Sequence, residues 1–165
     1  MMPYIREPRR LIPKRTLTEA DIGSEQRRWP YAGKGEVPPE GLAEAFADAV
    51  AIGHYHIDLH PTPTGRNSIY VEAAPFQIPL RSLVPVRVRN VLASGKCLGV
   101  THIANGATRM HTVEWSVGEA AGIAAAKCLL AGELPEALGE HGDLTSRIRE
   151  SLQARGAPLA WPWES

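Results

Sequence analysis

The feature of this sequence that most limits its fold is a long alanine-rich segment that ends at Gly132. It is preceded by a short apolar run at 91–93 and by a glycine-bearing turn at 95–99. Alanine is the strongest helix former, and a glycine followed closely by Pro135 is a typical helix end. The segment therefore predicts a strand, a loop and a long helix that begins within 108–112, where threonine hydroxyls can cap the first turn.

One face of this predicted helix carries very little side-chain bulk. Its residues are spaced by three and four positions, namely Gly118, Ala121, Gly122, Ala125 and Ala126. Each glycine inside a helix costs about 0.5 to 1 kcal/mol relative to alanine. We therefore expect another element to approach this face closely, either a sheet in ordinary helix packing or a cofactor.

The composition is that of one soluble globular unit. The chain has 165 residues, of which 44% are hydrophobic and 22% are charged, and its formal net charge is zero. A zero net charge gives no general attraction to nucleic acids or to membrane surfaces. No apolar run approaches the roughly 20 residues of a membrane-spanning helix, and Glu114, Glu119 and Lys127 interrupt the long helix. We therefore expect neither nucleic acid nor a membrane as a partner.

The cysteines lead to a prediction about the compartment. The sequence has 2 cysteines, Cys97 and Cys128, and they do not form a C-x-x-C pair. No N-terminal apolar segment typical of a secretion signal is apparent either. A reducing compartment fits this pattern best, and we expect a cytoplasmic protein.

Alternating residues predict strands in the first half of the chain. The segment 49–59 alternates apolar and polar side chains, and 68–79 is a second extended run after a turn at 61–67. Two such segments with a short connection are typical of an antiparallel hairpin. A short helix is expected from about residue 40 to Asp48, and the Gly- and Pro-rich stretch 23–39 is expected to be a loop.

The polar side of the first predicted strand is a candidate site. It presents His54, His56, Asp58 and His60 at alternate positions. Imidazoles and a carboxylate at this spacing can converge on a metal ion, and they can equally form a polar face toward solvent or a substrate cleft. We favour the cleft and expect no metal site.

The C-terminal part predicts a second, amphipathic helix. A short helical turn is expected within 134–141, and apolar residues then recur at every fourth position over 144–154. Asp143 is the expected N-cap of this helix and Gly156 its end. The tail carries Trp161 and Trp163, which we expect to dock on the domain or on a neighbour.

Several sequence blocks carry a resemblance to a known family. In chain order they are YIREPRRL at 4–11 with LTEADI at 17–22, GHYHIDLHP at 53–61, FQIPLRSLVP at 76–85 and NVLASGKCLGVTHIANGATRMHTVEWSVGEAAG at 90–122. Together they cover most of residues 4–130, so the match does not depend on a single motif. The sequence resembles the C-terminal part of the FAD-dependent oxidoreductases that are sometimes labelled xanthan lyase-like.

The resemblance implies a two-part flavoprotein. An N-terminal dinucleotide-binding unit would hold the ADP half of FAD, and the C-terminal part would close the flavin site. The G-x-G-x-x-G motif of such a unit is not found in this sequence. The implied cofactor-binding residues are Gly95, Lys96, Cys97, Arg109, Met110, His111, Thr112 and Gly118.

The same resemblance implies a substrate cleft beside the flavin. Its candidate residues are Asp58, His60 and Arg81, with His60 as the candidate catalytic residue. For Arg81, a structural salt bridge is an equally good interpretation.

The sequence thus predicts an α+β fold, in which antiparallel strands of a substrate-type domain adjoin the strand, loop and long helix of a flavin site. We expect one compact unit over 1–165. Within it, 1–88 would supply the substrate-domain strands, 89–132 the flavin-site segment and 133–165 a C-terminal helix and tail.

The expected function is that of a C-terminal fragment or subunit of an FAD-dependent oxidoreductase. Redox activity would require a dinucleotide-binding half, expected as a separately encoded subunit, so the isolated chain is expected to be inactive and to bind FAD weakly or not at all. An apolar surface suited to that half would also favour a homo-oligomer, most simply a dimer. The alternative is a stand-alone interaction or oligomerisation domain without catalysis.

Overall fold

The computed structural model describes residues 11–23, 43–61, 65 and 67–162, and it has the α+β architecture that the sequence predicts. Its helices are α1 (Glu19–Ile22), α3 (Asn105–Thr108), α4 (His111–Ala131) and α5 (Asp143–Ala154). Its strands are β1 (Ala49–Gly53), β2 (Ile57–Leu59), β3 (Ile69–Val71) and β4 (Phe76–Pro79). Short 3-10 helices are η2 (Leu80–Leu83), η3 (Gly95–Cys97) and η4 (Pro135–Ala137).

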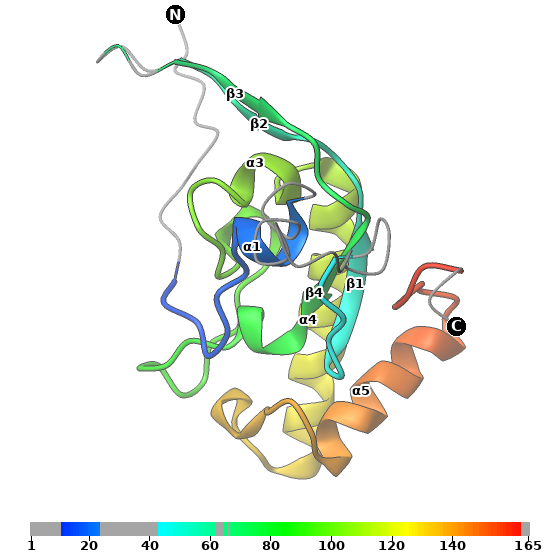
Figure 1. Cartoon of the computed structure of the whole chain (residues 1–165). Coiled ribbons are helices and arrows are strands. Elements are labelled where there is room, and N and C mark those ends of the chain that lie inside the picture. Colours follow the sequence, from blue (N-terminus) through cyan, green and yellow to red (C-terminus); the bar gives the residue numbers. More distant parts are fainter. Residues whose placement is uncertain (1–10, 24–42, 62–64, 66, 163–165) are drawn as a thin grey trace, which may run out of the picture.

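The strands form a bent hairpin made of short antiparallel pairs. β1 pairs with β4 in a register that places Ile52 opposite Gln77, and β2 pairs with β3 with Asp58 opposite Tyr70. Figure 1 shows β1 and β4 beside α4, whereas β2 and β3 continue past α3 as an extended arm. The antiparallel hairpin that the sequence predicts is therefore confirmed.

The prediction of continuous strands over 49–59 and 68–79 is wrong, because the hairpin is interrupted at residues 54–56 and 72–75. Opposite this interruption, the Ala74 amide donates a hydrogen bond to the Ile22 carbonyl at 2.8 Å. The returning segment thus pairs with the end of α1 instead of with residues 54–56. As a result, the polar side chains of the first segment do not share one strand face.

α4 is the longest helix and lies at the centre of the core. Its 21 residues end at Gly132, whose φ of 68° is the left-handed conformation of a helix C-cap, as the sequence predicts. α4 packs against β1 and α5, as Figure 1 shows, and its buried residues are Val113, Val117, Ala120, Ala121, Ala124 and Cys128. The expected threonine cap is wrong, because the N-cap is Met110, which makes no side-chain cap hydrogen bond.

The small-residue face of α4 is only partly covered. A Cβ at Gly118 would lie 3.6 Å from the Ser94 hydroxyl, which is ordinary contact, whereas a Cβ at Gly122 would meet nothing within 4 Å. Ala121 is buried, but Gly122 and Ala126 are exposed. The expected close packing is therefore wrong for Gly122, because the helix turns its alanine-rich side at 120–124 toward the core and leaves the adjacent side open.

Other local predictions have mixed outcomes. Residues 91–93 are not a strand, since Val91 is exposed and the Ala93 amide bonds only to the Leu83 carbonyl at 2.8 Å. Residues 43–48 are irregular with a turn instead of helical. The turn within 134–141 and the helix at 144–154 are confirmed as η4 and α5. The expected Asp143 cap is wrong, because Asp143 is the first residue of α5 and the N-cap is Gly142.

Some sequence predictions concern residues that the structure does not describe. The N-terminal YIREPRR block, nearly all of the predicted loop at 23–39 and Trp163 lie outside the described residues. Within the described part of the chain, no helix combines the length and the apolar character that are needed to cross a membrane.

Candidate functional site at the amino end of α4

The segment before α4 is fixed to the N-terminal part of the chain. The Leu17 amide donates to the Gly99 carbonyl at 3.0 Å, and the Thr101 amide donates to the Leu17 carbonyl at 2.9 Å. The Thr101 hydroxyl donates to the Glu19 carboxylate at 2.9 Å and accepts from the Ala104 amide at 3.1 Å. These bonds set the position at which α3 begins, and therefore the approach to α4.

α3 lies directly against β2, and this contact requires a glycine. A Cβ at Gly106 would stand 2.9 Å from the backbone nitrogen of Asp58, which is closer than Cβ contacts in proteins allow. One residue beyond α3, the Arg109 guanidinium donates to the Asp58 carbonyl. The junction between α3 and α4 is therefore tied to the arm that carries Asp58 and His60.

η3 lies along the first turns of α4. Its Lys96 ammonium is 3.4 Å from the Glu114 carboxylate, and Ser94 just before it is the neighbour of Gly118. Gly95 has a φ of 57°, a left-handed backbone conformation that glycine adopts without strain. Cys97 at the end of η3 is a free, exposed thiol. The predicted cofactor residues at 95–97 are thus brought beside the predicted residues of α4.

The amino end of α4 is open. His111 and Thr112 are exposed, while Met110 packs against the core. Among the described residues, no hydrogen bond occupies the amides of His111 and Thr112. Free amides and the helix dipole give this end a partial positive charge of roughly half a unit. It can therefore accept an anionic or carbonyl-type oxygen.

Buried polar groups without partners lie just before this helix. Asn105 and Thr108 are completely buried, and within the described residues neither the Asn105 amide group nor the Thr108 hydroxyl has a hydrogen-bond partner. Their separation of three residues places them on the same side of α3. Buried polar groups are nearly always paired, so this side of α3 needs a water, a ligand or another segment.

These two residues were missed by the sequence predictions. The available signal was a polar Asn105 and Thr108 among small residues that belong to one sequence block, at 104–108. Only the structure shows that both side chains are buried and unpartnered.

The structure brings two of the cleft candidates together with Arg109. His60 Nε2 lies 3.7 Å from Asp58 Oδ2, and the imidazole is more than half exposed. Since Arg109 binds the Asp58 carbonyl, this pair adjoins the junction of α3 and α4. Arg109, Asp58 and His60 thus form one group.

Arg81 belongs to a different group. Its guanidinium is 3.0 Å from the carboxylate of buried Asp48 and 3.0 Å from that of Glu140. Burial alone would lower the pKa of Arg81, but the hydrogen bonds and charges of Asp48 and Glu140 outweigh the burial and raise it. These contacts match the structural salt bridge that the sequence left open.

The other two histidines within 49–59 contact different aromatic residues. The His56 ring stacks on Tyr70 at 4.7 Å, and the His54 ring meets Trp161 edge to face at 6.3 Å. Trp161 therefore docks on the domain, as expected for the tail. In the part of the chain that the structure describes, no group of three or more His, Cys, Asp or Glu side chains is arranged to hold a metal ion.

Comparison with known proteins assigns the family. The sequence model of the family described as FAD dependent oxidoreductase matches residues 1–152. Searches of curated proteins and of solved structures gave no match. The family match covers nearly all of the 165 residues, including every element of the site at the amino end of α4. The chain therefore belongs to the FAD-dependent oxidoreductase family.

Proposed function

We propose that this chain forms the flavin-ring side of the FAD site, and part of the adjoining substrate cleft, in an FAD-dependent oxidoreductase. The observation that carries the proposal is the open amino end of α4, where the free amides of His111 and Thr112 adjoin η3 and Arg109. The family match supports FAD as the cofactor. The unpartnered Asn105 and Thr108 beside this end fit a site that is completed by another group.

The electrostatics of this end suit a flavin. When bound, FAD supplies the redox chemistry, and the protein supplies orientation and charge stabilisation. The free amides and the helix dipole would favour negative charge on the pyrimidine oxygens, which is the charge of an anionic reduced flavin. The proposed binding residues are Gly95, Lys96, Cys97, Arg109, Met110, His111, Thr112 and Gly118.

The substrate side of the site would be formed by the arm. His60 is exposed and lies 3.7 Å from the Asp58 carboxylate, so it can accept or donate the proton that accompanies oxidation of a substrate. Arg109 holds the Asp58 carbonyl and thereby fixes this pair relative to α4. We assign no cleft role to Arg81, because Asp48 and Glu140 already occupy its guanidinium.

The ADP half of FAD would be held by a unit outside these 165 residues. This follows from the absence of a G-x-G-x-x-G segment in the sequence. The unit can belong to the same polypeptide or to a separately encoded subunit. Inspection of the neighbouring reading frames distinguishes these arrangements.

The direct test uses lumiflavin, which contains the ring of FAD without its ADP half. Titration of lumiflavin fluorescence should show weak binding, and FAD should bind no more tightly than lumiflavin. A preparation of this chain alone should therefore be colourless. FAD that binds more than tenfold more tightly than lumiflavin, or that copurifies in equal amount, would overturn the assignment of the ADP half to another unit.

A backbone variant tests the helix amides. His111 is the first residue of α4, where proline is well tolerated, and Met110 before it has the extended backbone that proline requires. His111→Pro should keep the fold but remove one amide donor, and should weaken lumiflavin binding about threefold to tenfold. His111→Ala is the matched control, since it removes the same side chain and keeps the amide. Equal binding by the two variants would contradict the proposed role of the helix end.

A second candidate function is an interaction domain without catalysis. It is favoured by exposed apolar residues on α4, above all Trp115, Leu129 and Leu130. Such a surface suits either a dinucleotide-binding partner or a second copy of the chain. Binding of lumiflavin separates the two functions, because a pure interaction domain has no reason to bind the ring.

A further inference from the structure

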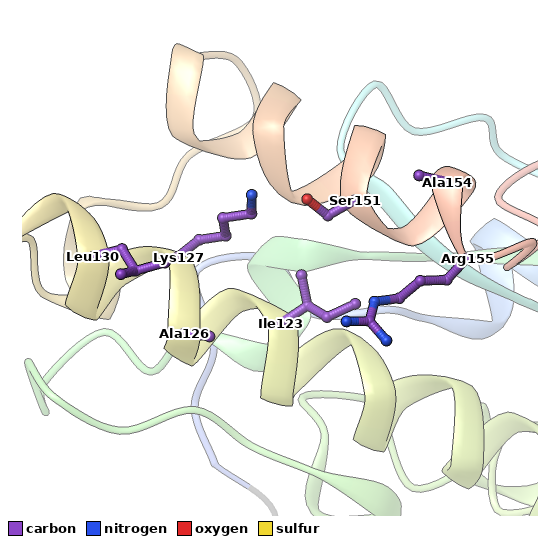
Figure 2. Close-up of a pocket in the computed structure, with 7 residues that line it drawn as sticks. All are labelled: Ile123, Ala126, Lys127, Leu130, Ser151, Ala154 and Arg155. Carbon is purple, nitrogen blue, oxygen red and sulfur yellow. The ribbon is translucent and has the colours of Figure 1, made fainter.

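The C-terminal half of α4 and the facing side of α5 enclose a groove. It has a volume of about 380 Å³ and an apolar lining from Ile123, Ala126, Leu130 and Ala154. Figure 2 shows Ile123 directed from α4 toward α5, between the side chains of Lys127 and Arg155. The groove therefore combines an apolar floor with a cation on either side.

The charged side chains of this groove are all positive. Among the described residues, Lys127 and Arg155 are the only charged ones that line it, in a chain whose formal net charge is zero. In the described part of the chain, neither cation takes part in a salt bridge or a side-chain hydrogen bond. Such cations favour a partner that brings carboxylates to the groove.

The apolar surface extends beyond the groove. Leu130, which lines the groove, is 82% exposed, and Leu129, which is outside the groove, is 81% exposed. Large aliphatic side chains that are exposed side by side are typical of protein interaction sites. The groove and Leu129 therefore offer an apolar contact surface to a polypeptide segment.

The backbone of the groove determines which kind of segment fits. Both walls are helices, whose amides and carbonyls are used within the helices, so a strand would find no edge to pair with. Ala126, Ser151 and Ala154 are small, which allows the backbone of a helix to approach closely. We propose that this groove binds an amphipathic helix of a partner protein whose apolar stripe is bordered by Asp or Glu side chains that pair with Lys127 and Arg155.

This interaction is independent of the proposed flavin site. Lys127 lies about 24 Å along α4 from His111, at a rise of 1.5 Å per residue. A helix in the groove therefore leaves the amino end of α4 open. The proposal does not rest on flavin binding, and its test can fail or succeed without changing the outcome of the lumiflavin experiment.

The test uses a synthetic 18-residue helical peptide, about 27 Å long as a helix, with leucines at positions i, i+3, i+4 and i+7 and glutamates on both sides of that stripe. Its fluorescence anisotropy is measured against the full chain. A second peptide carries lysine in place of every glutamate. The chain should bind the glutamate peptide at least tenfold more tightly than the lysine peptide.

Variants of the chain make the assignment specific. The double variant Lys127→Glu with Arg155→Glu should reverse the preference of the chain, so that the lysine peptide binds more tightly. The control is Arg87→Glu with Arg147→Glu, which changes the net charge equally at exposed positions outside the groove. Ala154→Trp on α5 should fill the groove and reduce binding at least tenfold, whereas Ala131→Trp at the end of α4, outside the groove, should not.

Three results would overturn the proposal. One is equal binding of the two peptides by the unmodified chain, and another is an unchanged preference in the Lys127→Glu with Arg155→Glu variant. The third is sedimentation that shows self-association blocked by Ala154→Trp, because the groove would then be occupied by a second copy of the chain.

Discussion

The carboxylate of Asp48 is buried without any exposed surface, and the guanidinium of Arg81 lies 3.0 Å from it. The Arg81 backbone amide also donates to this carboxylate at 3.0 Å. Asp48 directly precedes β1, and Arg81 lies in η2, which directly follows β4. This pair therefore closes the hairpin at its base, where Glu140 adds a second carboxylate.

Removing one member of this pair should lower the free energy of unfolding far more than removing both members. Arg81→Met leaves the buried Asp48 carboxylate without its cation, and should lower the free energy of unfolding by about 3 to 5 kcal/mol. Arg81→Met combined with Asp48→Asn should cost clearly less, because no buried charge is left unpaired. Urea unfolding at pH 7 of the single and double variants measures the difference. Additive effects of the two substitutions would show that the charges are not coupled.

Alanine substitution at two glycines should change the stability of the chain in opposite directions. Gly106→Ala places a methyl group 2.9 Å from the Asp58 backbone, so α3 must move away from β2, at a cost of about 1 to 3 kcal/mol. Gly122→Ala meets nothing within 4 Å and should stabilise α4 by about 0.5 to 1 kcal/mol. Thermal unfolding of both variants checks the prediction. A loss of stability in Gly122→Ala would mean that another element or a second copy of the chain covers this position.

The buried thiol of Cys128 should make stability depend on alkaline pH. Burial, together with the charge of Glu133, raises the pKa of Cys128. The folded chain therefore keeps this proton to higher pH than the unfolded chain, whose thiol titrates at about 8.5. The resulting stabilisation is fully present below that pH and is lost as the pH rises through the folded-state pKa.

Unfolding free energies from pH 7 to 10, measured with a reducing agent, test this dependence. Wild type should lose stability more steeply above pH 8.5 than Cys128→Ala, and Cys97→Ser should behave like wild type. In the native state at pH 8, a thiol reagent should label Cys97 at once and Cys128 only after unfolding. Parallel curves for wild type and Cys128→Ala would contradict the raised pKa.

The parts of the fold that were predictable are those set by local sequence. The alanine-rich run with Gly132 at its end determines α4, and the two extended segments 49–59 and 68–79, with a short connection between them, determine the hairpin. The break at residues 54–56 was not predictable, because it follows from a bond between Ala74 and Ile22, which lie far apart in sequence.

For the candidate site, too, the features set by local sequence were predictable and those set by distant contacts were not. The sequence block at 104–112 could locate the site, because its residues are consecutive. The partners of Arg81 could not be read from sequence, since Asp48 and Glu140 are distant in the chain and meet only in the folded state. The open side of α4 at Gly122 also depends on which face of the helix the core selects.

That open side carries a stripe that should cause the isolated chain to associate. Trp115, Gly122 and Leu129 recur at every seventh position, which places them on one side of α4, and Trp115 and Leu129 are 74% and 81% exposed. Gly122 leaves a gap between the larger residues into which a side chain of a second copy can fit. β1 is not available for such a contact, because it is largely buried by the chain itself.

We therefore predict a symmetric dimer that forms through the stripe of Trp115, Gly122 and Leu129. Light scattering at low micromolar concentration should give twice the mass of the chain. Trp115→Glu with Leu129→Glu should give a monomer, because two like charges would then face two more across the symmetric contact. The control, Val86→Glu with Val88→Glu, introduces the same charges at exposed apolar positions away from α4 and should remain dimeric. A monomeric wild-type chain would show that this stripe does not suffice for self-association.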